Sequence, residues 1–223
     1  MLKIVNSRFS ASAREMFLEK ISALVSEGKR AYLIVPEQQT VMAESLFSRA
    51  LPPSSVLLFE VTNFTRLANS TFRSLGGLSG EYCDSTKKAL IMWRTLTELS
   101  PVLTLTSGRH DISSGLVDSA LSAVGQMQNL GIRPEHLATV AENEALKSDG
   151  RLASKISDLS AIYTLYKQLL GERYADTGDD AEAMIKKLEE NPDFLTDTSI
   201  FVEGFSSFTE PQYRLLAILS ARG

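Results

Sequence analysis

This chain of 223 residues has little of what builds a metal or disulfide site: one cysteine, Cys83, and two histidines. A single cysteine excludes an internal disulfide framework and a cysteine-rich metal site. His110 and His136 lie far apart, and no other ligand pattern stands beside either of them. We therefore interpret both as surface or helix-end residues rather than as zinc ligands.

The sequence also lacks long apolar runs and an excess of positive charge. No stretch of about 18 apolar residues is present, so we expect no membrane-spanning helix. The start of the chain has no charged region followed by an apolar run and a cleavage site, so we expect no signal peptide and a cytoplasmic protein. The formal net charge of -4 argues against a generally basic nucleic-acid coat, although it leaves a local basic groove open.

The first sixty or so residues alternate between strand and helix patterns. We predict strands at 2–5, 31–35 and 55–61 and helices at 11–27, 40–50 and 63–75. Alternation of this kind is typical of right-handed crossovers and a parallel sheet covered by helices, which is the doubly wound α/β class. Ligands of such sheets bind at the carboxyl ends of the strands, so the segments that follow the predicted strands should share one edge.

From Ser85 to about Glu190 the apolar residues recur at helical spacing, and we predict a helix-bundle core with Trp93 as one of its anchors. One more strand, Ser199–Glu203, and a closing helix follow. We expect this strand to join the first sheet. Residues 1–80 and 195–223 would then form one α/β domain, and residues 81–194 an all-helical insertion.

The segment after the first predicted strand lacks glycine and lysine. A phosphate loop, G-x-x-x-x-G-K-[ST], surrounds phosphates with main-chain N–H groups, neutralises them with its lysine and holds Mg²⁺ with its hydroxyl. Aligned on the strand, this chain has Asn6 and Ala11 at the two glycines, Ser10 before the second, Ser12 at the lysine and Ala13 at the hydroxyl. We interpret the segment as a degenerate nucleotide loop.

Four segments, taken in order, resemble the N-terminal region of the B subunit of bacterial AddAB-type helicase–nucleases, RexB-like relatives included. The segments are VPEQQT (35–40), VTNFTRLA (61–68) with the glycine pair 76–77, KISDLSAIY (155–163) with Tyr166, and VEGFSSFTEPQ (202–212). Each segment is a weak motif by itself, but their order and spacing cover nearly the whole chain.

The resemblance implies a P-loop NTPase-like parallel sheet, as in the first motor domain of superfamily-1 helicases, with a large helical insertion. It implies a heterodimer with an AddA-type helicase–nuclease subunit, acting on single- and double-stranded DNA at broken ends. The nuclease and the iron–sulfur cluster of the family belong to a C-terminal region beyond this sequence. We therefore expect a fragment of a longer protein that is not itself catalytic and holds no cofactor.

The resemblance also places a helicase acid motif at the end of the last strand. Such a motif needs an Asp for Mg²⁺ and a Glu that orients water. Here Glu203 stands at the first position and Gly204 at the second. Together with Ser12 and Ala13, this degenerate acid motif predicts no ATP hydrolysis and neither ATP nor Mg²⁺ as a cofactor.

In related helicases the loops after the second and third strands face single-stranded DNA. The candidate DNA-binding residues are Glu37, Gln38, Gln39, Thr40, Thr62, Asn63, Phe64, Arg66, Asn69 and Phe208. Amides and hydroxyls can bond base edges, Arg66 can bind phosphate or guanine, and aromatic rings can stack on bases. Structural roles stay open: Thr62 and Asn63 as a helix cap, VPEQ as a strand stop and helix start, Phe205 and Phe208 as core.

Two other functions stay open at this point. The helical insertion could make the chain a protein-interaction scaffold without DNA contact. Alternatively, the chain could be an active P-loop enzyme with a non-standard loop, which would need a cation from elsewhere, such as Lys3 or Arg8.

Overall fold

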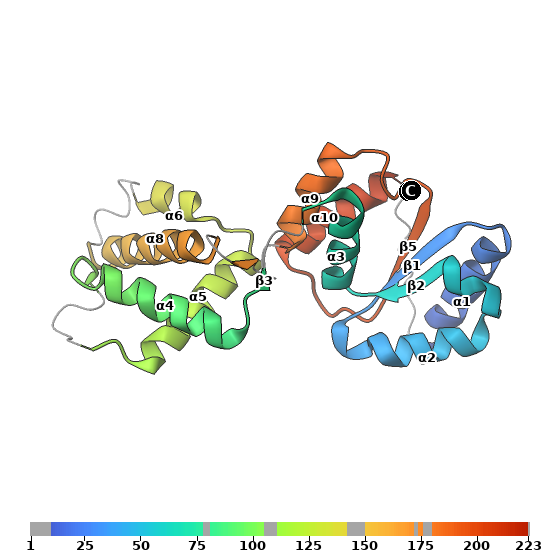
Figure 1. Cartoon of the computed structure of the whole chain (residues 1–223), viewed down its shortest axis with the longest axis horizontal. Helices are drawn as coiled ribbons and strands as arrows, with labels where there is room; N and C mark the ends of the chain where they lie inside the picture. The colour runs from blue at the N-terminus through green and yellow to red at the C-terminus, as the bar shows by residue number, and fades with distance from the viewer. Residues whose placement is uncertain are drawn as a thin grey trace. The chain divides into compact units, whose positions relative to one another are not determined.

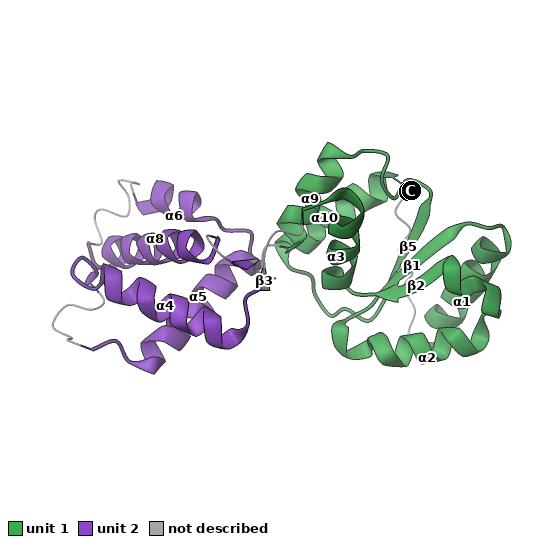
Figure 2. Ribbon diagram, viewed as in Figure 1, with its two compact units in different colours: residues 1–77, 180–223 green, residues 78–179 purple. Residues whose placement is uncertain are grey.

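The computed structural model describes residues 10–77, 81–104, 111–141, 150–171, 174–175 and 180–222. The chain divides into two compact units, which are described separately: unit 1 comprises residues 1–77 and 180–223, and unit 2 comprises residues 78–179 (Figure 2). The strand predicted at 2–5 and Asn6 lie outside the described residues.

Among its described residues, unit 1 contains a three-stranded sheet. The strands β1 (Arg30–Ile34), β2 (Phe59–Thr62) and β5 (Thr198–Val202) are parallel in the order β2-β1-β5 (Figure 1). Ile34 lies opposite Thr62 on one side and Val202 on the other. The prediction that the last strand joins the first sheet is confirmed, and the chain is a mostly helical α/β structure with a small parallel sheet.

Helices cover both faces of this sheet (Figure 1). They are α1 (Ser10–Ser26) and α2 (Thr40–Ala50) on one face, and α3 (Phe64–Leu75), α9 (Asp180–Glu190) and α10 (Glu210–Arg222) on the other. Because side chains alternate along a strand, Ala31 and Leu33 of β1 are buried with α1 and α2, whereas Tyr32 and Ile34 pack with α3, α9 and α10.

The prediction of a strand at 55–61 is wrong for its N-terminal half. Residues Pro53–Leu57 form a short 3-10 helix, η2, and the strand begins only at Phe59. Prolines 52 and 53 have fixed φ angles and no N–H for a ladder, and both the N–H and the hydroxyl of Ser55 donate to the Pro52 carbonyl, at 2.9 and 2.6 Å. The turn therefore closes locally before the strand starts.

Unit 2 is helical, as the spacing of its apolar residues predicts. It contains α4 (Ser85–Leu99), α5 (Ser114–Asn129), α6 (Pro134–Ala141), α8 (Gly150–Gly171) and a short parallel pair, β3 (Glu81–Tyr82) with β4 (Tyr174–Ala175). Met92, Leu96, Val117, Ile162 and Tyr166 are buried in its core. The helix α6 and the strand pair were not predicted.

Two details of the predicted insertion differ from the structure. Trp93 is not a core anchor: half of it is exposed, because α4 buries the face that carries Met92 and Leu96 instead. The helix α9, which we assigned to the insertion, packs in unit 1, where Met184 and Leu188 are buried in one cluster with residues of α3 and α10.

A buried carboxylate connects two parts of unit 2. Asp158 of α8 accepts hydrogen bonds from the main-chain N–H of Thr104, at 3.2 Å, and from its hydroxyl, at 2.6 Å. Asp158 is only 5% exposed, and these donors satisfy hydrogen-bond acceptors that have little access to bulk water. The bonds fix the segment that follows α4 against α8.

Candidate functional site

Three loops meet at the carboxyl edge of the sheet in unit 1: residues 35–40 after β1, 62–66 after β2 and 203–209 after β5. We call them the strand-end loops. Main-chain bonds join them, because the Val35 N–H donates to the Thr62 carbonyl at 2.9 Å and the Glu203 N–H donates to the Ile34 carbonyl at 3.0 Å. The pairing of three parallel strands thus brings together segments from both ends of the sequence.

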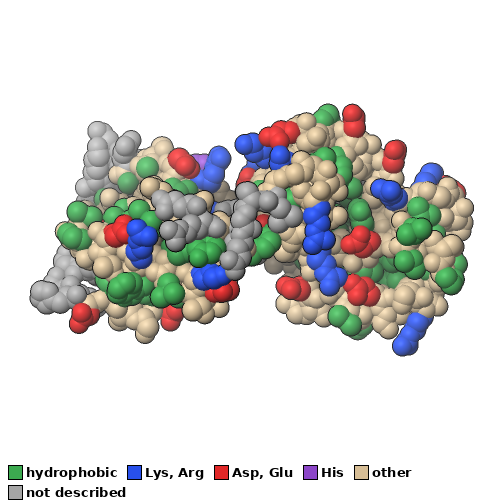
Figure 3. All heavy atoms as spheres, in the orientation of Figure 1, with side chains coloured by type: hydrophobic (Ala, Val, Ile, Leu, Met, Phe, Trp, Pro, Cys, Tyr) green, Lys and Arg blue, Asp and Glu red, His purple; other side chains and the backbone are tan. Residues whose placement is uncertain are grey.

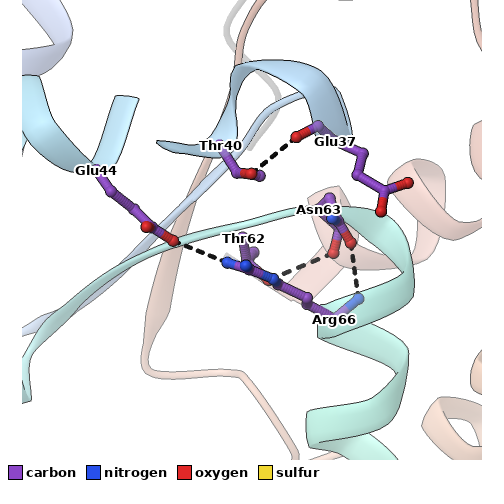
Figure 4. Close-up of polar contacts among 6 residues, drawn as sticks. All are labelled: Glu37, Thr40, Glu44, Thr62, Asn63 and Arg66. Atoms are coloured by element: carbon purple, nitrogen blue, oxygen red, sulfur yellow. Dashed lines mark hydrogen bonds and ion pairs between the residues drawn. The ribbon is translucent and has the colours of Figure 1, made fainter. Parts of the chain in front are cut away.

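The loop after β1 turns directly into a helix. Pro36 ends the strand, η1 (Glu37–Gln39) makes one tight turn, and the Thr40 hydroxyl donates to the Glu37 carbonyl at 2.8 Å (Figure 4). Thr40 is buried, whereas Glu37 and Gln38 are exposed. The structure therefore contains the strand stop and helix start that we left open, and it leaves two polar side chains at the surface.

The loop after β2 is a helix cap. The Asn63 side chain accepts from the Arg66 N–H at 2.8 Å, which satisfies one of the free donors at the start of α3, and the Thr62 hydroxyl donates to the Asn63 carbonyl at 3.3 Å (Figure 4). Thr62 is 1% and Asn63 8% exposed. Both residues are buried and stabilise the conformation of the loop through these hydrogen bonds.

Arg66 points away from this cap toward α2. Its Nη1 lies 2.8 Å from Glu44 Oε1, and both side chains are about half exposed (Figure 4). Exposed pairs of this kind contribute only about 0–1 kcal/mol, because water screens them and two long side chains lose freedom. Arg66 is therefore a cation that can exchange its carboxylate partner for another anion at little cost.

Four aromatic rings lie between the loops after β2 and β5. Phe64, at the start of α3, contacts Phe205 and Phe208 with ring centroids 5.4 and 6.2 Å away, and Phe205 and Phe208 are 5.0 Å apart. Tyr213 of α10 packs edge-on against Phe208 at 5.3 Å and is 59% exposed. The rings run from the buried core to the surface, with Phe208 half-buried in between.

A capping box fixes the end of the loop after β5. The Gln212 side chain accepts from the Thr209 N–H at 3.0 Å, and the Gln212 N–H donates back to the Thr209 hydroxyl at 3.4 Å. This reciprocal pair is the S/T-x-x-Q pattern that begins a helix. It starts α10 at Glu210 and so places Tyr213 one turn into the helix.

Gly204 lets two of the loops approach each other closely. Its φ of +84° is in the left-handed region, and a Cβ at this position would lie 2.5 Å from Gln39 Oε1 and 3.2 Å from Pro36 Cδ. An alanine here would have to adopt this left-handed φ and displace the end of the Gln39 side chain, which glycine avoids. Gly204 therefore has a structural role here, where the acid-motif alignment places the residue that would orient water.

The residues assigned to a degenerate nucleotide loop lie in part at the start of α1. Ser10, Ala11, Ser12 and Ala13 form its first turn, and Asn6 precedes the described residues. Glu203, at the end of β5, forms an ion pair with Arg14 of the same helix, with Nη2 2.7 Å from Oε1. Among the described residues, no group of three or more His, Cys, Asp or Glu side chains could hold a metal ion.

A family model described as "ADDB, N-terminal" matches residues 10–222, nearly the whole chain. The chain belongs to this AddB N-terminal family. The resemblance drawn from the four segments is thereby confirmed.

Curated relatives, each named as the B subunit of an ATP-dependent helicase/deoxyribonuclease, agree with this assignment. The chain is 28% identical over 220 residues to the protein of Acetivibrio thermocellus, with 98% of this chain and 19% of the relative covered. It is 28% identical over 223 residues to that of Clostridioides difficile, with 96% and 19% covered. For Ruminiclostridium cellulolyticum the identity is 27% over 191 residues, with 86% and 16% covered. The chain thus spans about a fifth of the length of these relatives.

Within this AddB-family chain the ten candidate DNA-binding residues divide into two groups. Glu37, Gln38 and Arg66 are exposed, and Gln39, Asn69 and Phe208 are half-buried. Thr40, Thr62, Asn63 and Phe64 are buried. Tyr213, which is exposed and contacts Phe208, was not among the predicted candidates; its position five residues after Phe208, at the start of a capped helix, was the available signal.

One face of the molecule carries mixed charges. On the face shown in Figure 3, acidic and basic side chains are interspersed over each unit rather than separated by sign. No helix among the described residues has both the length and the apolar composition to cross a membrane. Because the formal net charge is -4, binding of a polyanion would depend on a few placed cations rather than on the net charge of the chain.

Proposed function

We propose that this chain is the N-terminal, helicase-motor-like domain of an AddB-type subunit and that its strand-end loops bind single-stranded DNA. Family membership supports the first part. The second is supported by the positions of the loops that carry Gln38, Arg66 and Phe208. These loops follow three neighbouring parallel strands at the carboxyl edge of the sheet, where ligands of such sheets bind. The full-length protein would act with an AddA-type helicase–nuclease subunit on DNA ends during double-strand-break repair.

The exposed and buried candidates would have different tasks. Arg66 would bind a phosphate in place of Glu44, and the Gln38 amide would bond a base edge. The buried hydroxyls and amide of Thr40, Thr62 and Asn63 would keep the loops in position. The ring of Phe208 would stack on a base, and stacking contributes about 1–3 kcal/mol per base.

This proposal includes no ATP hydrolysis by the domain. A P-loop-like origin is supported by the parallel sheet and its helical layers, and Ser12 and Ala13 replace the lysine and the hydroxyl that phosphoryl transfer depends on. We expect isothermal calorimetry with Mg–ATP to give no binding heat that depends on Glu203. An ATPase rate lowered by Glu203→Ala would instead favour an active enzyme.

Fluorescence anisotropy with a labelled oligonucleotide tests the DNA contact. We expect Arg66→Ala to weaken single-strand binding about tenfold at low salt and to reduce the slope of log K against log salt by about one, because one phosphate contact is lost. Arg94→Ala is the matched control, since Arg94 is an exposed arginine paired with Glu98 in unit 2. Equal losses in both variants, or no salt-dependent binding at all, would contradict the proposal.

A scaffold without DNA contact is the second candidate, and one surface favours it. A shallow depression along α2 is lined by Gln38, Val41, Met42, Ser45, Leu46 and Arg49. Val41 is 73% and Met42 55% exposed, although apolar side chains on a helix usually face the core. Under this alternative, Met42→Glu would weaken association with the helicase subunit, and the wild-type chain would show no DNA binding.

A further inference from the structure

One ion pair joins α1 to the carboxyl end of β5, across 189 residues of sequence. Arg14 donates from Nε to Glu203 Oε1 at 2.8 Å, and its Nη2 lies 2.7 Å from the same oxygen. The Glu203 side chain is 12% exposed and the Arg14 side chain 27%. The pair is thus more buried than the other ion pairs given above, such as Arg66–Glu44 and Arg94–Glu98.

A ring contact on the same two elements supports this pair. Phe17 follows Arg14 by three residues and therefore lies on the same side of α1. Its ring meets that of Phe201 edge-on, with centroids 5.3 Å apart, and Phe201 precedes Glu203 by two residues on the same side of the strand. An apolar contact and a charged contact in register therefore hold one side of α1 against β5.

Because Glu203 is largely buried, the stability of its position depends on Arg14. A carboxylate that has lost most of its water is costly unless a cation and hydrogen-bond donors replace that water. Arg14 supplies the cation and the donors, because its Nε and Nη2 both contact Oε1 of Glu203. Removing Arg14 would leave a desolvated negative charge at the end of β5, which is a larger penalty than loss of an exposed pair.

We propose that Arg14 and Glu203 form an internal lock: the Arg14 guanidinium occupies the cation position beside the strand-end carboxylate and thereby fixes α1 to the loop after β5. The lock has two consequences. It makes the position of α1 depend on the segment that carries Gly204 and Phe205. It also keeps Glu203 from acting as a ligand for a divalent metal. Neither consequence depends on DNA binding by the other loops.

Hydrogen exchange of the 223-residue chain tests the lock. We expect Arg14→Ala and Glu203→Ala each to speed amide exchange in α1 about tenfold, while exchange in α3 and α8 stays within twofold of wild type. The double variant should be no faster than the faster single variant, because the two residues act through one contact. Arg94→Ala, which removes an exposed arginine, should leave α1 unchanged. Unchanged exchange in α1 of Arg14→Ala, or additive effects in the double variant, would overturn the proposal.

Two further variants cover the case in which an alanine variant does not fold. Glu203→Gln keeps the size of the side chain and one acceptor oxygen, so we expect an intermediate rate of α1 exchange. The swap Arg14→Glu with Glu203→Arg should protect α1 better than Glu203→Gln does, whereas a swap that protects no better than Glu203→Gln would contradict the lock.

Manganese alone tests the second consequence. Electron paramagnetic resonance of Mn²⁺ titrated with the wild-type chain and with Glu203→Gln should give the same amount of bound metal. Binding to the wild type that is lost in Glu203→Gln would show that the carboxylate is available to metal, and the lock would be refuted.

Discussion

Unit 1 and unit 2 reach a packed core by different routes. Unit 2 is one continuous segment in which apolar residues at helical spacing come together, with Met92, Leu96 and Ile162 fully buried. Unit 1 is closed by the pairing of β1 with β5, from opposite ends of the sequence. Consequently the candidate site of unit 1 exists only after long-range pairing, because the loop after β5 comes from the opposite end of the chain to the loops after β1 and β2.

The two units also hold their loops in place by different means. In unit 2 the buried Asp158 fixes a segment through hydrogen bonds to Thr104. In unit 1 two loops are held close together at Gly204, because the absence of a side chain lets Gln39 approach. Each anchor can be removed by one substitution, and the units should respond separately.

The largest expected effect is that of a core cavity confined to one unit. Leu215 in unit 1 and Leu96 in unit 2 are both fully buried, and truncation of such a leucine to alanine costs about 2–5 kcal/mol. Scanning calorimetry should show that Leu215→Ala lowers the transition of unit 1 and Leu96→Ala that of unit 2. If either variant lowers all transitions equally, the two units do not unfold independently.

Loss of the carboxylate in unit 2 should cost less. Asp158→Ala leaves the N–H and hydroxyl of Thr104 without their acceptor, a loss of about 1–3 kcal/mol in the free energy of unfolding. Trp93, the single tryptophan of the chain, lies in unit 2 and reports its urea unfolding by fluorescence. Asp158→Asn keeps one acceptor and should lose about half as much; an unchanged midpoint for Asp158→Ala would contradict the anchoring role.

A glycine-to-alanine change should destabilise unit 1 at one position and stabilise unit 2 at another. Gly204→Ala must adopt a left-handed φ and displace Gln39, at a cost of about 1–2 kcal/mol. Gly125, inside α5, has no heavy atom within 4 Å of an added Cβ, so Gly125→Ala should stabilise unit 2 by up to about 1 kcal/mol. Thermal unfolding of both variants measures the contrast, and destabilisation by Gly125→Ala would refute the local argument.

The smallest effect should come from the cap of α4. Asp84 accepts from the Lys87 N–H at 2.8 Å, and this bond lowers the pKa of Asp84 below its ordinary value of 3.8. A carboxylate with a lowered pKa stabilises the fold fully above the unfolded value and loses that stabilisation as pH falls through the folded one. Asp84→Ala should therefore lower the Tm of unit 2 by a few degrees at pH 7 and by less below about pH 3.8. A pH-independent difference would mean that the charge contributes nothing.

Sequence reasoning predicted the helices of unit 2 and the alternation of unit 1 because both depend on local spacing. It was wrong for elements whose conformation or packing depends on the residues around them. The prolines before Ser55 replaced half a strand with a 3-10 turn, and the face of α4 that packs left Trp93 half exposed. Helical periodicity identified α9 but could not show that its apolar face belongs with α3 and α10.

The same division applies to the candidate site. The order of motifs identified the family and the segments that meet at the sheet edge. It could not separate Gln38 and Arg66, which are exposed, from Thr62 and Asn63, which are buried, because burial depends on the loops packed around them. It also missed Tyr213 and the role of Arg14, since neither residue belongs to a motif.

The amino-acid sequence alone determined the family, the helical spacing of the apolar residues in unit 2 and the absence of glycine and lysine after the first predicted strand, since these are properties of residue identity and spacing. The tertiary structure alone decided which polar groups face the solvent and that Arg14 neutralises Glu203. The physical reason is that burial and ion pairing depend on atoms brought together from distant parts of the chain, and local periodicity carries no information about them.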